Sequence, residues 1–187
     1  MAQFKDVKRL IKALSKHWYD GDEAKTRRWA AAMDLGKLGD KIAVPQLIKA
    51  LADSNELVRL YASEALGKLG DRGAVPHLIK VLADSDKNIR KAAEEALWKL
   101  MDKSAVPHLI KVLADSNEYV RGTAAKALGK LGDRGAVPPL LEALADSTAY
   151  VRQAAAEVLG KLGDKSAVPH LIKVLADSDK NIRKAAE

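Results

Sequence analysis

The chain contains no cysteine and few aromatic residues, and each shortage narrows what it can do. None of its 187 residues is Cys, and Phe, Trp and Tyr together make up 4%. The absence of cysteine excludes disulfides, thiolate metal ligands and cysteine nucleophiles, and it suits a reducing compartment such as the cytoplasm. Because apolar residues still make up 48% of the chain, we predict a core of small and medium aliphatic side chains.

Long hydrophobic runs and glycine-rich phosphate loops are missing as well. No apolar stretch approaches the ~20 residues that a membrane-spanning helix needs. Residues 1–18 are basic with apolar residues at helical spacing, which suits a membrane-surface helix or the first helix of a repeat. We favour the repeat, because VKRLIKAL at 7–14 matches the start of every later unit. The sequence therefore predicts no membrane partner and no nucleotide cofactor.

The chain repeats itself every 31 residues. One proline per unit has this spacing: Pro45, Pro76, Pro107, Pro138 and Pro169. An aspartate follows at the same spacing: Asp53, Asp84, Asp115, Asp146 and Asp177. An arginine completes the pattern: Arg59, Arg90, Arg121, Arg152 and Arg183. Such a period predicts a stack of identical supersecondary units. The segment at 74–94 recurs unchanged at 167–187, which points to recent duplication or to engineering.

Each unit reads as two helices joined by a tight turn. In residues 41–71, apolar residues at helical spacing from Val44 to Leu51 predict a short helix A with Pro45 in its first turn. Asp53 and Ser54 supply capping oxygens for a longer helix B, and Gly70 ends that helix in the left-handed conformation. No segment alternates with the period of a strand, so the sequence predicts an all-α fold.

The motif AVPxLIKxLADSxxxVRxxAAxALGKLGD resembles HEAT repeats of the short phycobilisome-lyase class, and it is similar to consensus-designed solenoids of that class. The resemblance implies a right-handed α-solenoid in which the B helices line a concave wall. It also implies that Asp53, Arg59 and their copies form a ladder between repeats. We expect one solenoid domain over 1–187. Its parts are a divergent capping repeat at 1–40, full repeats at 41–71, 72–102, 103–133 and 134–164, and an incomplete repeat at 165–187.

The two ends of the array differ from its middle. In the first unit Arg27 and Asp34 replace the buried Val58 and Ala65, which predicts a stripe that faces water. Six extra residues around Trp18 and Tyr19 separate its two helices, as a docking feature or as part of a simple cap. In the last unit we expect an open apolar edge, formed by Leu171, Ile172, Leu175 and Ile182. This edge predicts a homodimer, or else a longer array that continues as EALWKLM.

Catalytic and metal-binding residues do not emerge from the repeat pattern. His77, His108 and His170 are copies of one position, and stacked helices ~10 Å apart hold them too far from one another for one metal. In HEAT-like metal hydroxylases Glu follows His, whereas here Trp or Leu follows every His. We therefore predict a non-enzymatic protein without catalytic, metal or cofactor residues. Lyase-type activity rests on family analogy alone and is the weaker alternative.

Variation between nearly identical copies marks a candidate partner-binding surface on helix B. Position 57 and its equivalents read Leu57, Asn88, Tyr119, Tyr150 and Asn181. In the engineered relatives this stripe carries the randomised binding residues, and exposed aromatic residues suit an interface. Incidental surface drift is the alternative explanation. We predict a protein partner on the concave surface, bound by Trp29, Leu57, Leu60, Tyr61, Glu64, Trp98, Tyr119 and Tyr150.

An invariant column of lysines completes the predicted binding surface. Its members near the ends of the B helices are Lys37, Lys68, Lys99, Lys130 and Lys161. With a net charge of +7, the column suggests nucleic acid or another polyanion as the alternative partner. Helix C-termini also favour cations, which explains the column without a ligand. Nearby, Trp98 and Met101 replace two glycines of the other repeats, so we expect the turn after residue 100 to differ.

Overall fold

The computed structural model describes residues 2–15 and 21–186, and their regular structure is helical throughout. This confirms the predicted all-α fold. The chain forms two compact units, Met1–Met101 and Asp102–Glu187. Unit 1 holds α1 (Ala2–Leu14), α2 (Asp22–Leu38), α3 (Val44–Ala50), α4 (Glu56–Leu69), α5 (Val75–Val81) and α6 (Lys87–Leu100). Unit 2 holds α7 (Val106–Val112), α8 (Glu118–Leu131), α9 (Val137–Ala143), α10 (Ala149–Leu162), α11 (Val168–Val174) and α12 (Lys180–Ala186).

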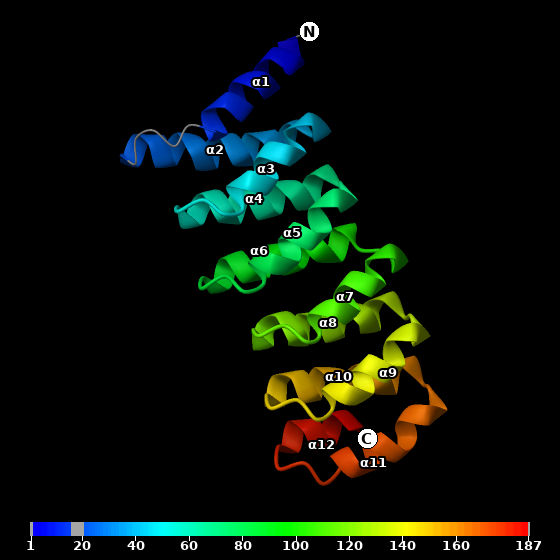
Figure 1. Cartoon of the computed structure of the whole chain (residues 1–187). Helices are drawn as coiled ribbons and strands as arrows, with labels where there is room; N and C mark the ends of the chain where they lie inside the picture. Colours follow the sequence, from blue (N-terminus) through cyan, green and yellow to red (C-terminus); the bar gives the residue numbers. More distant parts are fainter. Residues whose placement is uncertain (1, 16–20, 187) are drawn as a thin grey trace. The chain divides into compact units, whose positions relative to one another are not determined.

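Within each unit the helices stack in pairs, each pair being one sequence repeat. The odd-numbered helices are the A helices and the even-numbered ones the B helices. In unit 1, α2, α4 and α6 lie side by side, and α3 and α5 pack against α4 and α6 (Figure 1). In unit 2, α8, α10 and α12 form the corresponding row, with α7, α9 and α11 against them. The predicted single domain over 1–187 stays a prediction.

Local sequence explains where the helices begin and end. A short 3-10 turn precedes each A helix from α3 onward, and Asp71 caps one of them by accepting a hydrogen bond from the Gly73 amide. Asn55 is the N-cap of α4, and its side chain accepts a hydrogen bond from the Val58 amide, so the predicted caps Asp53 and Ser54 are wrong. Asp53 instead accepts from the Asn55 amide and shapes the loop before the helix.

Glycines end the B helices and bring them close together. Gly70 ends α4 with φ of 69°. Its counterparts Gly39, Gly132 and Gly163 end α2, α8 and α10, also at positive φ. A Cβ on Gly67 would lie 2.9 Å from Ala96 Cα, so α4 and α6 approach at a distance that only glycine allows. After α6, Met101 adopts an extended conformation with φ of −73°. This confirms that the turn after residue 100 differs from the others.

The two ends partly match their predictions. Arg27 is exposed and pairs with Glu23, as expected of a stripe facing water. The extra segment around Trp18 and Tyr19 falls within residues 16–20, outside the described residues. At the other end the prediction for Ile182 is wrong: its side chain is fully buried, because α12 packs against α10 and α11.

The apolar side chains that do reach the surface at this edge lie on α11 and just after it. Ile172 is 61% exposed and Leu175 43% exposed, whereas Leu171 is half-buried. The predicted homodimer through this edge stays a prediction. Among the described residues, no helix is long and apolar enough to cross a membrane.

Candidate partner-binding surface

Arginine–aspartate pairs hold neighbouring B-helix repeats in register. Arg59 donates to both carboxylate oxygens of Asp84 in the next repeat, from Nε at 2.7 Å and Nη2 at 3.1 Å. Its Nη1 donates to the Asp53 carbonyl at 2.9 Å, within its own repeat. One side chain thus joins two loops by directed hydrogen bonds. The same arrangement links Arg121 to Asp146 and Arg152 to Asp177, which confirms the predicted ladder.

The ladder also begins one repeat earlier than we predicted. Arg28 on α2 donates to both carboxylate oxygens of Asp53, at 3.0 and 3.2 Å. Both side chains are 1% exposed, so this is the most buried pair of the series. The sequence carried a signal for it, because Arg28 lies 31 residues before Arg59.

Two aspartates of the ladder, Asp84 and Asp146, are held in their charged form. Hydrogen bonds from Arg121 lower the pKa of Asp146 below its ordinary value of 3.8, against the opposing effect of burial. For Asp84, burial alone would raise the pKa, but hydrogen bonds from Arg59 and from the Asp86 amide outweigh it and leave the pKa lowered. The Arg59–Asp84 and Arg121–Asp146 pairs therefore remain ionic at neutral pH.

In unit 1 the predicted surface residues cluster on α2 and α4. Trp29 and Tyr61 stack across the two helices with ring centroids 5.4 Å apart. Leu57 is 45% exposed, and Leu60 and Glu64 are half-buried on the same helix as Tyr61. Trp98 lies half-buried in the last turn of α6. The structure thus brings Trp29 and Tyr61 together as an aromatic pair beside exposed leucine.

In unit 2 a second aromatic pair lies on α8 and α10. The Tyr119 and Tyr150 ring centroids are 6.2 Å apart, and Lys126 Nζ lies 4.6 Å from the centre of the Tyr150 ring. Tyr119 is 46% exposed, whereas Tyr150 is half-buried. A Cβ on Gly122 would overlap the Tyr150 ring, so this glycine makes the seat for the ring. Sequence reasoning found both tyrosines but missed the role of Gly122 and Lys126.

The lysine column is exposed, and each lysine lies in the last turn of its helix, as predicted. The stems of Lys68 and Lys99 run over the glycines of the preceding helix: their Cδ atoms lie 3.7 and 3.8 Å from the Cβ positions of Gly36 and Gly67. Lys37 Nζ pairs with Asp34 at 3.1 Å. Two features favour lysine at these positions. The ammonium group lies at the negative end of the helix dipole, and the aliphatic stem covers the glycine of the preceding helix.

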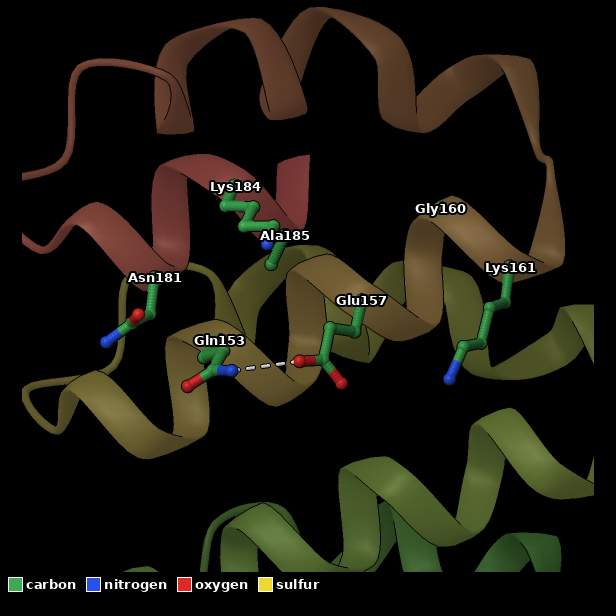
Figure 2. A pocket seen from close by; sticks show the side chains of 7 residues that line it. All are labelled: Gln153, Glu157, Gly160, Lys161, Asn181, Lys184 and Ala185. Carbon is green, nitrogen blue, oxygen red and sulfur yellow. Dashed lines mark hydrogen bonds between the residues drawn. The ribbon is translucent and has the colours of Figure 1, made fainter. Parts of the chain in front are cut away.

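A groove of about 670 Å³ lies between α10 and α12 and was not predicted from the sequence. Its lining residues are Gln153, Glu157, Gly160, Lys161, Asn181, Lys184 and Ala185 (Figure 2). Gln153 Nε2 donates to Glu157 Oε1 at 2.9 Å along one wall. No Cβ built on Gly160 would meet another atom within 4 Å, in contrast to Gly36 and Gly67.

The histidines lie away from these surfaces. His77, His108 and His170 are exposed on the A helices α5, α7 and α11. In the described part of the chain, no three His, Cys, Asp or Glu side chains gather closely enough to hold a metal ion. The B helices instead display aromatic rings, side-chain amides and lysine ammonium groups. Such groups are suited to contacts with the surface of a partner molecule.

Comparison with known proteins assigns this architecture to a family. Residues 7–98 and 101–187 match the model of HEAT repeats. The chain belongs to the HEAT repeat family. This HEAT repeat chain is similar to a chain from the complex of CpcE and CpcF of phycocyanin lyase from Nostoc sp. PCC7120, at 32% identity and a TM-score of 0.53. The alignment covers 96% of this chain and 74% of that one. The predicted family resemblance and helical solenoid are confirmed.

Two further solved structures share the fold. A computationally designed armadillo repeat protein for modular peptide recognition is 23% identical with a TM-score of 0.53, over 96% of both chains. A chain from a study of microtubule plus end tracking by XMAP215, CLIP-170 and EB1 is 20% identical with a TM-score of 0.74, over 96% of this chain and 87% of that one. No curated protein sequence matches the chain.

Proposed function

We propose that this HEAT repeat chain is a non-enzymatic scaffold that binds a protein partner through its B helices. The binding surface, here called the B-face, has a part in each unit, formed by exposed and half-buried side chains. In unit 1 these are Trp29, Leu57, Leu60, Tyr61, Glu64, Lys68, Trp98 and Lys99, and in unit 2 they are Tyr119, Lys130, Tyr150 and Lys161. We also propose that the chain works in a reducing compartment such as the cytoplasm, which suits a chain without cysteine.

The seat that Gly122 provides for Tyr150 is the observation that carries the proposal. A glycine inside a helix costs about 1 kcal/mol relative to alanine. Here that glycine leaves room for an aromatic ring which packs against Tyr119 and under Lys126. A ring held in place before binding loses little entropy when a partner covers it, so it is a good anchor for an interface.

The backbone contacts support the predicted concave position of the B-face. Close approach at Gly36 and Gly67 brings the B helices of unit 1 together, as the inner wall of a curved stack requires. The ladder fixes the spacing between repeats, so that side chains on successive helices keep their distances. Of the structural neighbours, one is designed for peptide recognition and another belongs to a complex of two proteins. Both kinds of partner suit the B-face.

Capture from a lysate treated with nuclease tests the proposal. We expect the tagged wild-type chain and a His77→Ala/His108→Ala control to retain the same protein, as identified by mass spectrometry. A Tyr119→Ala/Tyr150→Ala variant should lose it, because both rings are removed from the B-face. Retention by the tyrosine variant together with loss by the histidine control would place the interface on the A helices and overturn the proposal.

Nucleic acid is the second candidate partner, because all five lysines of the column are exposed. If it binds there, log affinity should fall linearly with log salt concentration, and removing Lys99 and Lys130 should lower the slope by roughly one unit each. Fluorescence anisotropy with a labelled duplex measures this slope. A flat response to salt would exclude the lysine column as a track for phosphates.

A further inference from the structure

In unit 1 the aromatic pair of the B-face lies beside a carboxylate. Trp29 on α2 and Tyr61 on α4 stack with ring centroids 5.4 Å apart and an angle of 29° between the ring planes. Both residues are half-buried, so part of their surface remains exposed. Glu64 follows Tyr61 by three residues on α4, and residues at this spacing are neighbours on the surface of a helix. An aromatic surface and a negative charge therefore lie side by side.

The charge of Glu64 is not neutralised by the part of the chain that the structure describes. Its side chain is half-buried, and its carboxylate takes part in no hydrogen bond or ion pair with the described residues. Lys68, one turn later, runs instead over α2, with its Cδ 3.7 Å from the Cβ position of Gly36. Glu95 occupies the same position in the next repeat, and there Lys91 Nζ lies 3.9 Å from the carboxylate. Glu64 thus differs from its counterpart in lacking a cation.

The aromatic pair of unit 2 has a cation of its own. Lys126 lies two repeats after Glu64, at the same position of its B helix, and its Nζ is 4.6 Å from the centre of the Tyr150 ring. A cation at this distance is attracted by the negative face of the ring. In unit 1 the same position carries the opposite charge. A cation on the rings of unit 1 would therefore come from another molecule.

We propose that Trp29, Tyr61 and Glu64 bind an arginine side chain of the protein partner. The guanidinium group is planar, so it stacks on an aromatic ring, and its parallel N–H groups donate to both oxygens of a carboxylate. The aromatic pair and the neighbouring Glu64 offer both contacts to one side chain. This proposal rests on the proposed function, since it names the group that the partner presents to the B-face in unit 1.

Arginine suits this place better than an apolar side chain or lysine. An apolar side chain that covered the rings would also cover Glu64 and leave its charge without a partner, which costs free energy. Lysine neutralises the charge, but its compact ammonium group lacks the planar fork that stacks on a ring and pairs with both carboxylate oxygens. Leu57, 45% exposed and four residues before Tyr61, adds apolar surface for the aliphatic stem of arginine.

Selection from a library of short random peptides displayed on phage tests the proposal. With the immobilised wild-type chain, we expect the recovered peptides to be enriched in arginine over the unselected library. The same selection with Glu64→Gln should lose this enrichment, because the neutral amide no longer pairs with a guanidinium group. Glu95→Gln is the matched control and should keep the enrichment. Its carboxylate already has Lys91, and Ala92 stands where α4 has Tyr61.

A recovered peptide then gives the size of the effect. Citrulline in place of its arginine removes the charge and keeps nearly the same shape. Calorimetry with the wild-type chain should show binding at least about tenfold weaker for the citrulline peptide, which corresponds to about 1.4 kcal/mol. The two peptides should bind the Glu64→Gln chain within about threefold of each other, because the charge of arginine then has no carboxylate to pair with.

Arginine enrichment that survives Glu64→Gln would overturn the proposal. So would recovered peptides without arginine enrichment that are lost on Trp29→Ala/Tyr61→Ala, a result that leaves the proposed function standing. Peptides that bind both this variant and Tyr119→Ala/Tyr150→Ala as they bind the wild type would place the interface outside the B-face and contradict the proposed function as well. A library that yields no peptide would overturn this proposal alone, because capture of a protein partner tests the proposed function independently.

Discussion

The arginine in each rung of the ladder connects two repeats and satisfies its own loop at the same time. Arg121 binds the Asp146 carboxylate of the next repeat and the carbonyls of Asp115 and Ser116. Both charged side chains are 13% exposed, so water replaces these partners poorly. Removing the arginine takes two donors from a largely buried carboxylate, which keeps the Thr148 amide as a backbone donor, and one donor from each carbonyl. This is costlier than breaking a surface pair.

We expect Arg121→Ala to lower the free energy of unfolding by about 2 to 4 kcal/mol. Chemical denaturation measures this value. Lys37→Ala is the matched control, because the Lys37–Asp34 pair is 59% and 44% exposed, and it should cost less than ~0.5 kcal/mol. Equal small losses for both variants would show that the ladder does not stabilise the stack.

The lowered pKa of Asp146 predicts how acid affects the same rung. Because the folded state holds this carboxylate below its ordinary pKa of 3.8, the stabilisation is complete above that value and is lost as pH falls through the lower folded pKa. Thermal melts between pH ~6 and ~2.5 should show the advantage of the wild type over Asp146→Asn shrinking below pH ~4. An advantage that stays constant across this range would contradict the ionic role of Asp146.

Periodicity predicted the helices well, because each repeat combines strong local signals. Proline, capping aspartate or asparagine, a heptad-like apolar stripe and a final glycine all agree within one unit. The cap itself fell at Asn55 rather than Asp53, because a loop with several capping residues offers competing partners. The predicted exposure of Ile182 was also wrong. Its burial depends on how α12 packs on α10 and α11, which the spacing of apolar residues in the sequence does not reveal.

The same glycine position should respond oppositely in two repeats. In Gly67→Ala the new Cβ would meet Ala96 Cα at 2.9 Å, so α4 and α6 must move apart and the free energy of unfolding should fall. In Gly160→Ala the Cβ meets nothing within 4 Å, so the better helix propensity of alanine should raise stability by up to about 1 kcal/mol. Chemical denaturation of both variants decides this. Changes of the same sign would contradict the close contact between B helices.

For the molecule as a whole, the 31-residue repeat predicted the family and the architecture. It predicted only part of the candidate binding surface. Copies that differ at position 57 pointed to Tyr119 and Tyr150. The contact between Gly122 and the Tyr150 ring could not be predicted, because a glycine in a helical sequence does not indicate which side chain of another helix packs against it. The groove beside Gly160 could not be predicted either, since it depends on where two helices lie relative to each other.

The central claim is that Tyr150, seated on Gly122, anchors a protein partner on the B-face. The most direct test is calorimetry of the captured partner with Gly122→Ala, which keeps every aromatic residue but displaces the Tyr150 ring. We predict an affinity lower by ~1 to 2 kcal/mol, as for Tyr150→Ala, with stability within about 1 kcal/mol of the wild type. Unchanged affinity in both variants, with a loss in His77→Ala/His108→Ala, would contradict the account.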